Sequence, residues 1–232
     1  MPKTLHKSTK SAFKFDLPFA FVSSILCRVL KKTSLWRTRT KPSFEQEFSI
    51  TRNCFSYIPG EELGVILDLS CGQARMGRTL LQTGFPGHVT VIGADSSLAM
   101  LEDARLLSNA DGVHLFLIQC DAACLPFATG SISGIYAGSA LHVWSQVPES
   151  LSEIYRVLQP GGRLVMTTAV ALYEDSSPLL LAITERVVAN LYSTLRVFTT
   201  EELFSLVKEA GLTDVQVVSI SDGMACVLAS KQ

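Results

Sequence analysis

Three aspartates follow successive apolar segments of the chain at nearly regular intervals. Asp68, Asp95 and Asp121 are 27 and 26 residues apart, about the length of one strand–helix unit. If these segments are neighbouring parallel strands, the three carboxylates gather at one edge of the sheet. There Asp95 would accept hydrogen bonds from both hydroxyls of a ribose, or it would cap the following helix. We therefore predict a ligand site at this edge.

The turn after the first aspartate is built from small residues, in the stretch Asp68-Leu-Ser-Cys-Gly-Gln-Ala-Arg75. Gly72 allows the backbone to approach a ligand closely, although any tight strand–helix turn selects small residues. A dinucleotide site would need three glycines at G-x-G-x-x-G spacing to hold a pyrophosphate. Only Gly72 is present, and Asp68 would repel phosphate. The sequence therefore disfavours a nicotinamide-dependent oxidoreductase.

Apolar runs alternate with segments of helical periodicity along most of the chain. The pattern predicts strands over 64–70, 88–94, 113–119, 132–137 and 162–169, and helices over 75–83, 97–107 and 148–158. Thr199 and Glu202 have the spacing of a capping box, and that helix should end near Gly211. Two further runs, 215–220 and 224–229, flank a Ser-Asp-Gly turn and predict a hairpin with at least one antiparallel strand. We therefore predict an α/β fold: a doubly wound, mostly parallel seven-stranded sheet with helices on both faces and a C-terminal antiparallel hairpin.

Charge is distributed unevenly along the chain. Residues 1–44 contain ten Lys or Arg and a single acid, Asp16, so their formal charge is +9, whereas the whole chain carries −1. This basic arm predicts peripheral contact with an anionic membrane surface, a transit segment or a solvated tail; no nucleic-acid partner is expected. Helical spacing over 19–32 and 44–57 adds two cap helices, so we predict a boundary between residues 1–60 and 61–232.

Composition restricts the class of protein further. The chain is 47% hydrophobic and 18% charged, which suits a large folded core rather than a disordered chain. No stretch approaches the roughly 20 apolar residues of a membrane-spanning helix. The six cysteines lie singly, without zinc-type spacing, so no metal site is expected and a reducing compartment is favoured. We expect a cytoplasmic or plastid protein.

Several motifs together resemble those of the class I S-adenosylmethionine-dependent methyltransferases. They are Ile66-Leu-Asp-Leu-Ser-Cys-Gly72, Asp95, Cys120-Asp-Ala122 with Leu125-Pro-Phe127, and the run from Ile154 to Leu164. The segment Ala137-Gly-Ser-Ala-Leu-His-Val-Trp144 resembles the ubiquinone/menaquinone-methyltransferase-like enzymes (methyltransferase type 11), above all the uncharacterised plastid group of plants and algae. The resemblance covers roughly four fifths of the chain. It implies a Rossmann-like methyltransferase fold, and S-adenosylmethionine as cofactor for residues 61–232.

The resemblance also assigns roles to individual residues. It implies that Asp95 holds the ribose and that His142 lies near the sulfonium and the acceptor. If a general base acts, a neutral His142 is the nearest candidate; otherwise it positions the substrate or caps a loop. The remaining cofactor contacts that it implies are Asp68, Ser70, Cys71, Gly72 and Ala74 at the methionine part, Ser96, Met100, Asp121 and Ala122 near the adenine, and Gly138 and Ser139 near the sulfonium.

Ala74 stands where the family generally has a third glycine. We expect its methyl group to crowd the loop, so that Ala74→Gly tightens cofactor binding and slightly lowers stability. The methyl acceptor is expected to be a small, lipophilic molecule. Trp144, Leu141 and the apolar segment 179–191 either shape its pocket or pack in the core. The alternative is a catalytically weak or inactive binding protein with the methyltransferase fold.

Overall fold

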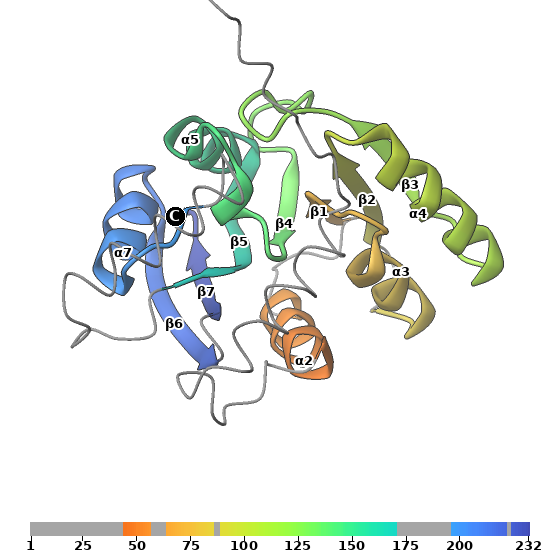
Figure 1. Ribbon diagram of the computed structural model, residues 1–232, viewed down its shortest axis with the longest axis horizontal. Helices are drawn as coiled ribbons and strands as arrows, with labels where there is room; N and C mark the ends of the chain where they lie inside the picture. Colours follow the sequence, from red (N-terminus) through yellow and green to blue (C-terminus); the bar gives the residue numbers. More distant parts are fainter. Residues whose placement is uncertain (1–43, 57–63, 86–88, 171–195, 222–223) are drawn as a thin grey trace, which may run out of the picture. The chain divides into compact units, whose positions relative to one another are not determined.

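The computed structural model of the protein describes residues 44–56, 64–85, 89–170, 196–221 and 224–232 (Figure 1). The chain divides into two units, residues 1–39 and 40–232, and every described residue belongs to the second unit. The helix predicted over 19–32 and the apolar segment 179–191 lie outside the described residues. The first described helix, at residues 44–55, belongs to the unit that contains the sheet, although it precedes the boundary predicted at residue 60.

The described residues form one seven-stranded mixed sheet, with strand order β3-β2-β1-β4-β5-β7-β6. Strands β1 to β5 pair in parallel, while β7 runs antiparallel to both β5 and β6. The predicted mostly parallel sheet and C-terminal hairpin are therefore confirmed, with β7 inserted between its partners. The strands are β1 (Gly64–Leu69), β2 (Val89–Asp95), β3 (Phe116–Gln119), β4 (Ile132–Ala137), β5 (Leu158–Ala169), β6 (Thr213–Ser221) and β7 (Met224–Ser230).

Helices cover both faces of the sheet, as predicted. Helices α2 and α3 contribute to one hydrophobic cluster and α5 and α7 to another, while α4 packs against β2 and β3. A short 3-10 turn, η2, follows β4. The bounds are α2 (Phe44–Phe55), α3 (Arg75–Gln82), α4 (Leu98–Ala110), η2 (Leu141–Val143), α5 (Val147–Val157) and α7 (Thr200–Glu209).

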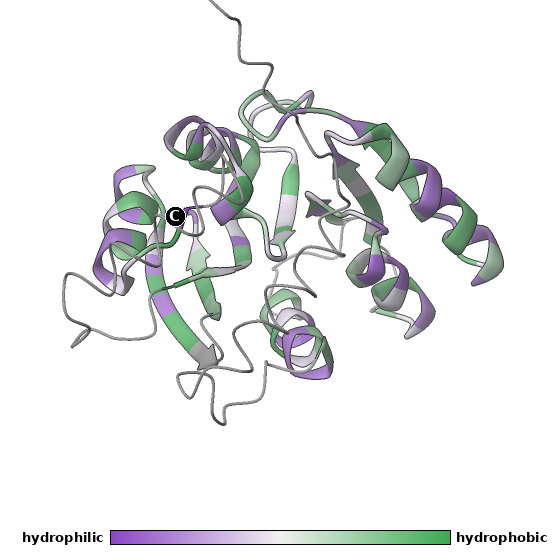
Figure 2. Ribbon diagram, in the orientation of Figure 1, coloured by the Kyte–Doolittle hydropathy of each residue, from purple (hydrophilic) through white to green (hydrophobic). Residues whose placement is uncertain are grey.

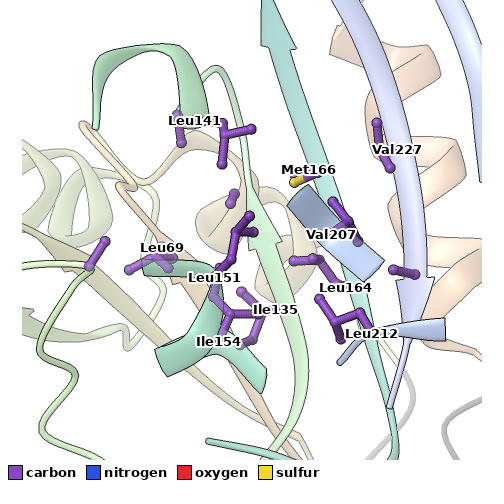
Figure 3. Close-up of a cluster of buried hydrophobic side chains, with 14 of the residues drawn as sticks. Leu69, Ile135, Leu141, Leu151, Ile154, Leu164, Met166, Val207, Leu212 and Val227 are labelled. Carbon is purple, nitrogen blue, oxygen red and sulfur yellow. The ribbon is translucent and has the colours of Figure 1, made fainter. Parts of the chain in front are cut away.

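The period of the strands divides the core into two layers. Along β1, Ile66 packs with α2 and α3, whereas Leu67 and Leu69 pack with α5 and α7, because successive side chains point to opposite faces. Figure 3 shows the second layer, where Leu151 and Ile154 lie near Leu69 and Ile135. In Figure 2, α4 carries alternating hydrophilic and hydrophobic bands, as a helix with one face on a sheet should.

Two local expectations need correction. The third strand starts at Phe116 rather than at residue 113, because it lies at the edge of the sheet and pairs only with Ile92 to Asp95 of β2. At the start of α7, Thr199 Oγ1 accepts the Glu202 N–H at 3.1 Å, as predicted. The Glu202 carboxylate pairs with Arg196 rather than with the Thr199 N–H that a full capping box would engage.

Candidate functional site

The carboxyl edge of the sheet contains a pocket at the point where the strand order reverses. From β1 the chain proceeds outward to β2 and β3, then returns to β4 on the other side of β1, so the loops after β1 and β4 diverge and leave a crevice. The pocket has a cavity volume of about 120 Å³ and is open to solvent. It is lined by the residues that follow four strands: Leu69, Ser70, Asp95, Ser96, Cys120, Asp121, Ala122, Val143, Trp144, Ser145, Gln146 and Ser150.

Asp95 connects two loops at the centre of this edge. Its Oδ2 accepts the Gly72 N–H at 2.8 Å, and its Oδ1 accepts the Ser97 N–H at 2.9 Å. The cap of α4 is Ser97, whose hydroxyl accepts the Met100 N–H, so neither Asp95 nor Ser96 is the N-cap residue. Because a carboxylate offers about four lone-pair sites, Asp95 retains acceptor capacity at the pocket wall.

The turn between β1 and α3 is conformationally strained. Ser70, Gly72 and Ala74 have φ values of +55°, +52° and +52°, a region that costs an L-residue with a side chain roughly 1–2 kcal/mol. Hydrogen bonds hold this shape: the Cys71 N–H donates to Ala94 O, and the Trp144 indole N–H donates to Ser70 Oγ at 2.9 Å. The Ala74 side chain is fully buried and does not line the pocket.

Asp68 faces α3 and does not line the pocket. Its side chain is only 2% exposed, and Oδ2 accepts the Gly77 N–H at 2.9 Å. Burial raises the pKa of this carboxyl to about 7; the Gly77 hydrogen bond lowers the pKa, and the nearby Asp95 charge raises it further. Asp68 is thus poised to gain or lose a proton near neutral pH.

Residues of β5 hold the turn that follows β4. Ser139, at φ +52°, donates its N–H to Thr167 Oγ1 at 2.8 Å. The His142 ring is 4% exposed, and its Nδ1 accepts the Ala169 N–H at 3.2 Å and lies 3.3 Å from Thr168 Oγ1. Burial lowers the pKa of His142 to about 4. The ring is therefore neutral at pH 7 with Nδ1 already engaged, an arrangement that favours the positioning role over proton abstraction.

Gly138 is needed for the packing of a tyrosine. A side-chain carbon at this position would overlap the Tyr136 phenol. That phenol is buried, and its hydroxyl donates to Glu47 Oε2 of α2 at 2.9 Å. Burial, followed by the Glu47 charge, raises the pKa of Tyr136. The absence of a side chain at Gly138 thus leaves room for the Tyr136 phenol, whose hydroxyl connects β4 to α2.

The pocket brings together part of the predicted set. Five predicted residues line it: Ser70, Asp95, Ser96, Asp121 and Ala122. Eight others do not: Asp68, Cys71, Gly72, Ala74, Met100, Gly138, Ser139 and His142. Trp144, for which the sequence left an acceptor pocket or core packing open, also lines this pocket. Sequence reasoning missed the following lining residues, three of which lie between β4 and α5: Leu69, Cys120, Val143, Ser145, Gln146 and Ser150.

The lining of the pocket is acidic. Asp95 and Asp121 are its ionisable carboxylates, and its described lining includes no Lys or Arg. Burial, followed by the Asp121 charge, raises the pKa of the Cys120 thiol to about 11, so it stays protonated. In the part of the chain that the structure describes, no group of three His, Cys, Asp or Glu residues is placed to bind a metal ion. Within the same residues, no helix has the length and apolar character needed to cross a membrane.

Comparison with known proteins identifies the family. The ubiquinone/menaquinone biosynthesis C-methyltransferase of Desulfotalea psychrophila is 33% identical over 168 residues, which cover 66% of this chain and 67% of that protein. The chain belongs to the class I S-adenosylmethionine-dependent methyltransferases. A family described as a methyltransferase domain matches residues 66–162 of this methyltransferase. The resemblance predicted from the motifs is therefore confirmed.

Two further comparisons agree with this assignment. An uncharacterised chloroplastic methyltransferase of Arabidopsis thaliana is 29% identical over 190 residues, which cover 78% of this methyltransferase and 51% of the relative. The chain thus spans about half the length of that relative. The YcgJ protein of Bacillus subtilis has the same fold, with a TM-score of 0.67 at 17% identity, covering 81% of this chain and 99% of that one.

Proposed function

We propose that this methyltransferase binds S-adenosylmethionine in the pocket at the carboxyl edge and transfers its methyl group to a small, lipophilic acceptor. One observation carries the proposal: Asp95 and Asp121, from neighbouring strand ends, line a pocket whose described lining includes no Lys or Arg. S-adenosylmethionine has a sulfonium, an ammonium group and no phosphate, so two carboxylates attract it. The pyrophosphate of a dinucleotide would be repelled by the same carboxylates.

The geometry supports a placement for each part of the cofactor. Asp95 has lone pairs available for the ribose hydroxyls, while Ser96, Asp121 and Ala122 form the wall beside it for the adenine. The methionine part would then follow Ser70 toward Gly72 and the turn of Gly138 and Ser139. Asp95 holds the Gly72 N–H, so the ribose wall and the methionine loop are fixed to each other.

In the proposed methyl transfer, the main task of the side chains is to align the methyl donor with the acceptor. When bound, S-adenosylmethionine would supply an electrophilic methyl group: its bond to sulfur breaks with the electron pair going to sulfur, the acceptor's nucleophile forms the new bond, and the proton displaced from the acceptor passes to solvent water. The protein aligns the two partners, an effect worth up to about 7–11 kcal/mol. Trp144 and Val143, which follow β4, contribute apolar surface to the pocket lining. His142 fixes the η2 turn that precedes Trp144, through its contact with Ala169.

The proposed acceptor and cellular setting rest on relatives and on charge. The name of the Desulfotalea relative refers to ubiquinone and menaquinone biosynthesis, which supports an acceptor of the quinol class. The chloroplastic relative supports a plastid location. The basic arm of residues 1–44 supports peripheral contact with an anionic membrane, where such an acceptor would dissolve.

Calorimetry followed by a transfer assay tests the proposal. We expect S-adenosylmethionine and S-adenosylhomocysteine to bind the full chain, and reduced nicotinamide dinucleotide to produce no heat. Isotopically methylated cofactor incubated with lipophilic quinols that have an unmethylated ring carbon should label the quinol. Absence of cofactor binding contradicts the proposal at its first step. Binding without transfer to any acceptor tried contradicts the proposed reaction and supports the binding-protein alternative.

A further inference from the structure

The loop after β3 forms one wall of the pocket and is held by another helix. Asp121 and Ala122 line the pocket, and four residues further on the Leu125 side chain is buried in the core. The backbone of Leu125 is bonded by two side chains of α5. Its N–H donates to Glu153 Oε2 at 2.8 Å, and its carbonyl accepts from Arg156 Nη2 at 3.0 Å. Helix α5 thus provides the partners that a neighbouring strand would provide in a sheet.

Glu153 and Arg156 form a two-point pair on one face of α5. Arg156 Nε lies 2.6 Å from Glu153 Oε1, and Nη2 lies 2.8 Å from Oε2. Arg156 Nη1 also donates to the Phe127 carbonyl at 2.8 Å. The Arg156 hydrogen bond is the main cause that lowers the pKa of Glu153, which stays ionised at neutral pH. A planar guanidinium held at two points presents its other N–H groups in a fixed direction.

The same helix also contributes directly to the pocket lining. Gln146 immediately precedes α5, Ser150 lies in its first turns, and both line the pocket. Glu153 lies one turn beyond Ser150 and does not line the pocket, and neither does Arg156. The spacing between the Ser150 wall and the Asp121–Ala122 wall therefore depends on the bonds from Glu153 and Arg156 to Leu125 and Phe127.

We propose that Glu153 and Arg156 are positioning residues that fix the Asp121–Ala122 wall against α5 and so determine how tightly and how selectively the pocket binds adenine. The inference rests on the proposed function, because it assigns this wall to the base. A fixed Asp121 carboxylate accepts a hydrogen bond from the 6-amino group of adenine and repels the 6-oxo group of hypoxanthine. If the loop after β3 is no longer held against α5, the pocket should lose its preference for adenine over hypoxanthine before it loses affinity for the rest of the ligand.

Binding of two matched ligands tests the pair. S-adenosylhomocysteine and S-inosylhomocysteine differ only in the base, and their Kd values are measured by calorimetry on the full chain. We expect Arg156→Gln and Glu153→Gln to weaken S-adenosylhomocysteine binding about five- to twentyfold, a range typical of residues that act on a site without touching its ligand. They should reduce the preference for adenine by a similar factor. Arg156→Lys keeps the positive charge but not the planar pair of N–H donors. It should therefore lose less affinity and less preference for adenine than Arg156→Gln.

A control variant separates positioning from general destabilisation. Glu202→Gln on α7 removes a carboxylate from another ion pair, with Arg196, that does not line the pocket, and it should leave both Kd values unchanged. All titrations are made well below each variant's Tm, so that every variant is folded. If the wild-type chain fails to bind S-adenosylhomocysteine, the proposed function itself fails. If the wild type binds but the Glu153 and Arg156 variants keep the wild-type preference for adenine, the inference alone is overturned.

Discussion

Asp95 shows how one side chain can serve structure and binding together. Its two oxygens hold the N–H groups of Gly72 and Ser97, so the loop after β1 and the start of α4 share one carboxylate. Each oxygen retains a further lone pair that a ribose hydroxyl could use. Removing the side chain should therefore affect both ligand binding and the stability of the fold.

We predict that Asp95→Ala weakens S-adenosylmethionine affinity by about 1.5–3 kcal/mol, the usual loss for hydrogen bonds to a charged group. It should also lower the free energy of unfolding, because the Gly72 and Ser97 N–H groups lose their partner. Calorimetry and urea denaturation measure the two effects separately. Asp95→Asn retains one acceptor oxygen and should lie between the wild type and the alanine variant. An unchanged affinity in Asp95→Ala would remove Asp95 from the ligand site.

Ala74 reverses one expectation drawn from the sequence. We expected glycine here to cost stability by enlarging the unfolded ensemble, by about 0.4–1 kcal/mol. The backbone at Ala74 is left-handed, with φ +52° and ψ +40°, which costs alanine about 1–2 kcal/mol and glycine nothing. The second effect is larger. We therefore predict that Ala74→Gly raises the free energy of unfolding by about 0.5–1 kcal/mol.

Urea denaturation of the two proteins checks this prediction, and calorimetry checks affinity in the same samples. The Ala74 methyl group is buried and lies outside the pocket lining. Any gain in affinity must then come from relief of the loop rather than from space for the ligand. A glycine variant less stable than the wild type would show that the loop is not strained at this residue.

At the scale of elements, the sequence predicted most where strands are buried on both faces. Strand β4 was predicted with its observed bounds, and all six of its residues are buried. Asp68 was expected at the ligand edge, but it lies between Leu67 and Leu69, which pack toward α5 and α7. The alternation of β1 alone directs Asp68 toward α3, a signal that was present in the sequence.

The stretch between β4 and α5 could not be predicted in the same way. Its residues have neither strand nor helix periodicity, and its path is fixed by contacts with remote elements. Ser139 binds Thr167 of β5, His142 binds Ala169, and Trp144 binds Ser70. These partners are at least 27 residues away in the chain, so no local pattern predicts them. Three of the six missed pocket residues, Val143, Ser145 and Gln146, lie here for that reason.

Strand β4 and helix α2 provide a prediction at this scale. Gly138→Ala places a methyl group where the Tyr136 phenol lies and displaces the hydroxyl from Glu47. Overpacking of this kind typically costs about 1–3 kcal/mol, and we predict such a loss in urea denaturation. Gly64→Ala on β1 is the control, because its added carbon meets Ser133 only at ordinary contact distance. Equal stability of the Gly138 variant and the wild type would contradict the assigned packing.

At the scale of the whole molecule, the basic arm of residues 1–44 and the rest of the chain carry opposite net charges. Residues 1–44 carry +9 while the whole chain carries −1, so the rest of the chain is acidic. We predict that the full chain binds anionic vesicles and that binding weakens steeply with salt, because exposed charges are screened over about 8–10 Å at moderate ionic strength. Removing residues 1–14 should weaken vesicle binding and leave cofactor affinity unchanged. Equal sedimentation of both forms with vesicles would exclude the arm as a membrane contact.

The stability of the whole fold depends on pH through two buried groups that act in opposite directions. The pKa of Asp68 is raised from 3.8 to about 7 by burial, so between these values the unfolded chain holds fewer protons and stability falls as pH rises. The pKa of His142 is lowered from 6.5 to about 4 by burial, so between these values the unfolded chain holds more protons and stability rises with pH. From about pH 4.5 to 6.5 the two contributions largely cancel.

Single substitutions should reveal each contribution by removing the other. We predict that Asp68→Asn makes the free energy of unfolding rise more steeply from pH 4.5 to 6.5 than in the wild type, by up to about 1.4 kcal/mol per pH unit. Asparagine still offers an oxygen to the Gly77 N–H, so the fold should survive. His142→Asn should change the slope in the opposite direction by a similar amount. Urea denaturation at several pH values measures all three slopes, and comparison with the wild type removes the contribution of every other titrating group. Parallel curves for the three proteins would show that neither group is titrated abnormally in the folded chain.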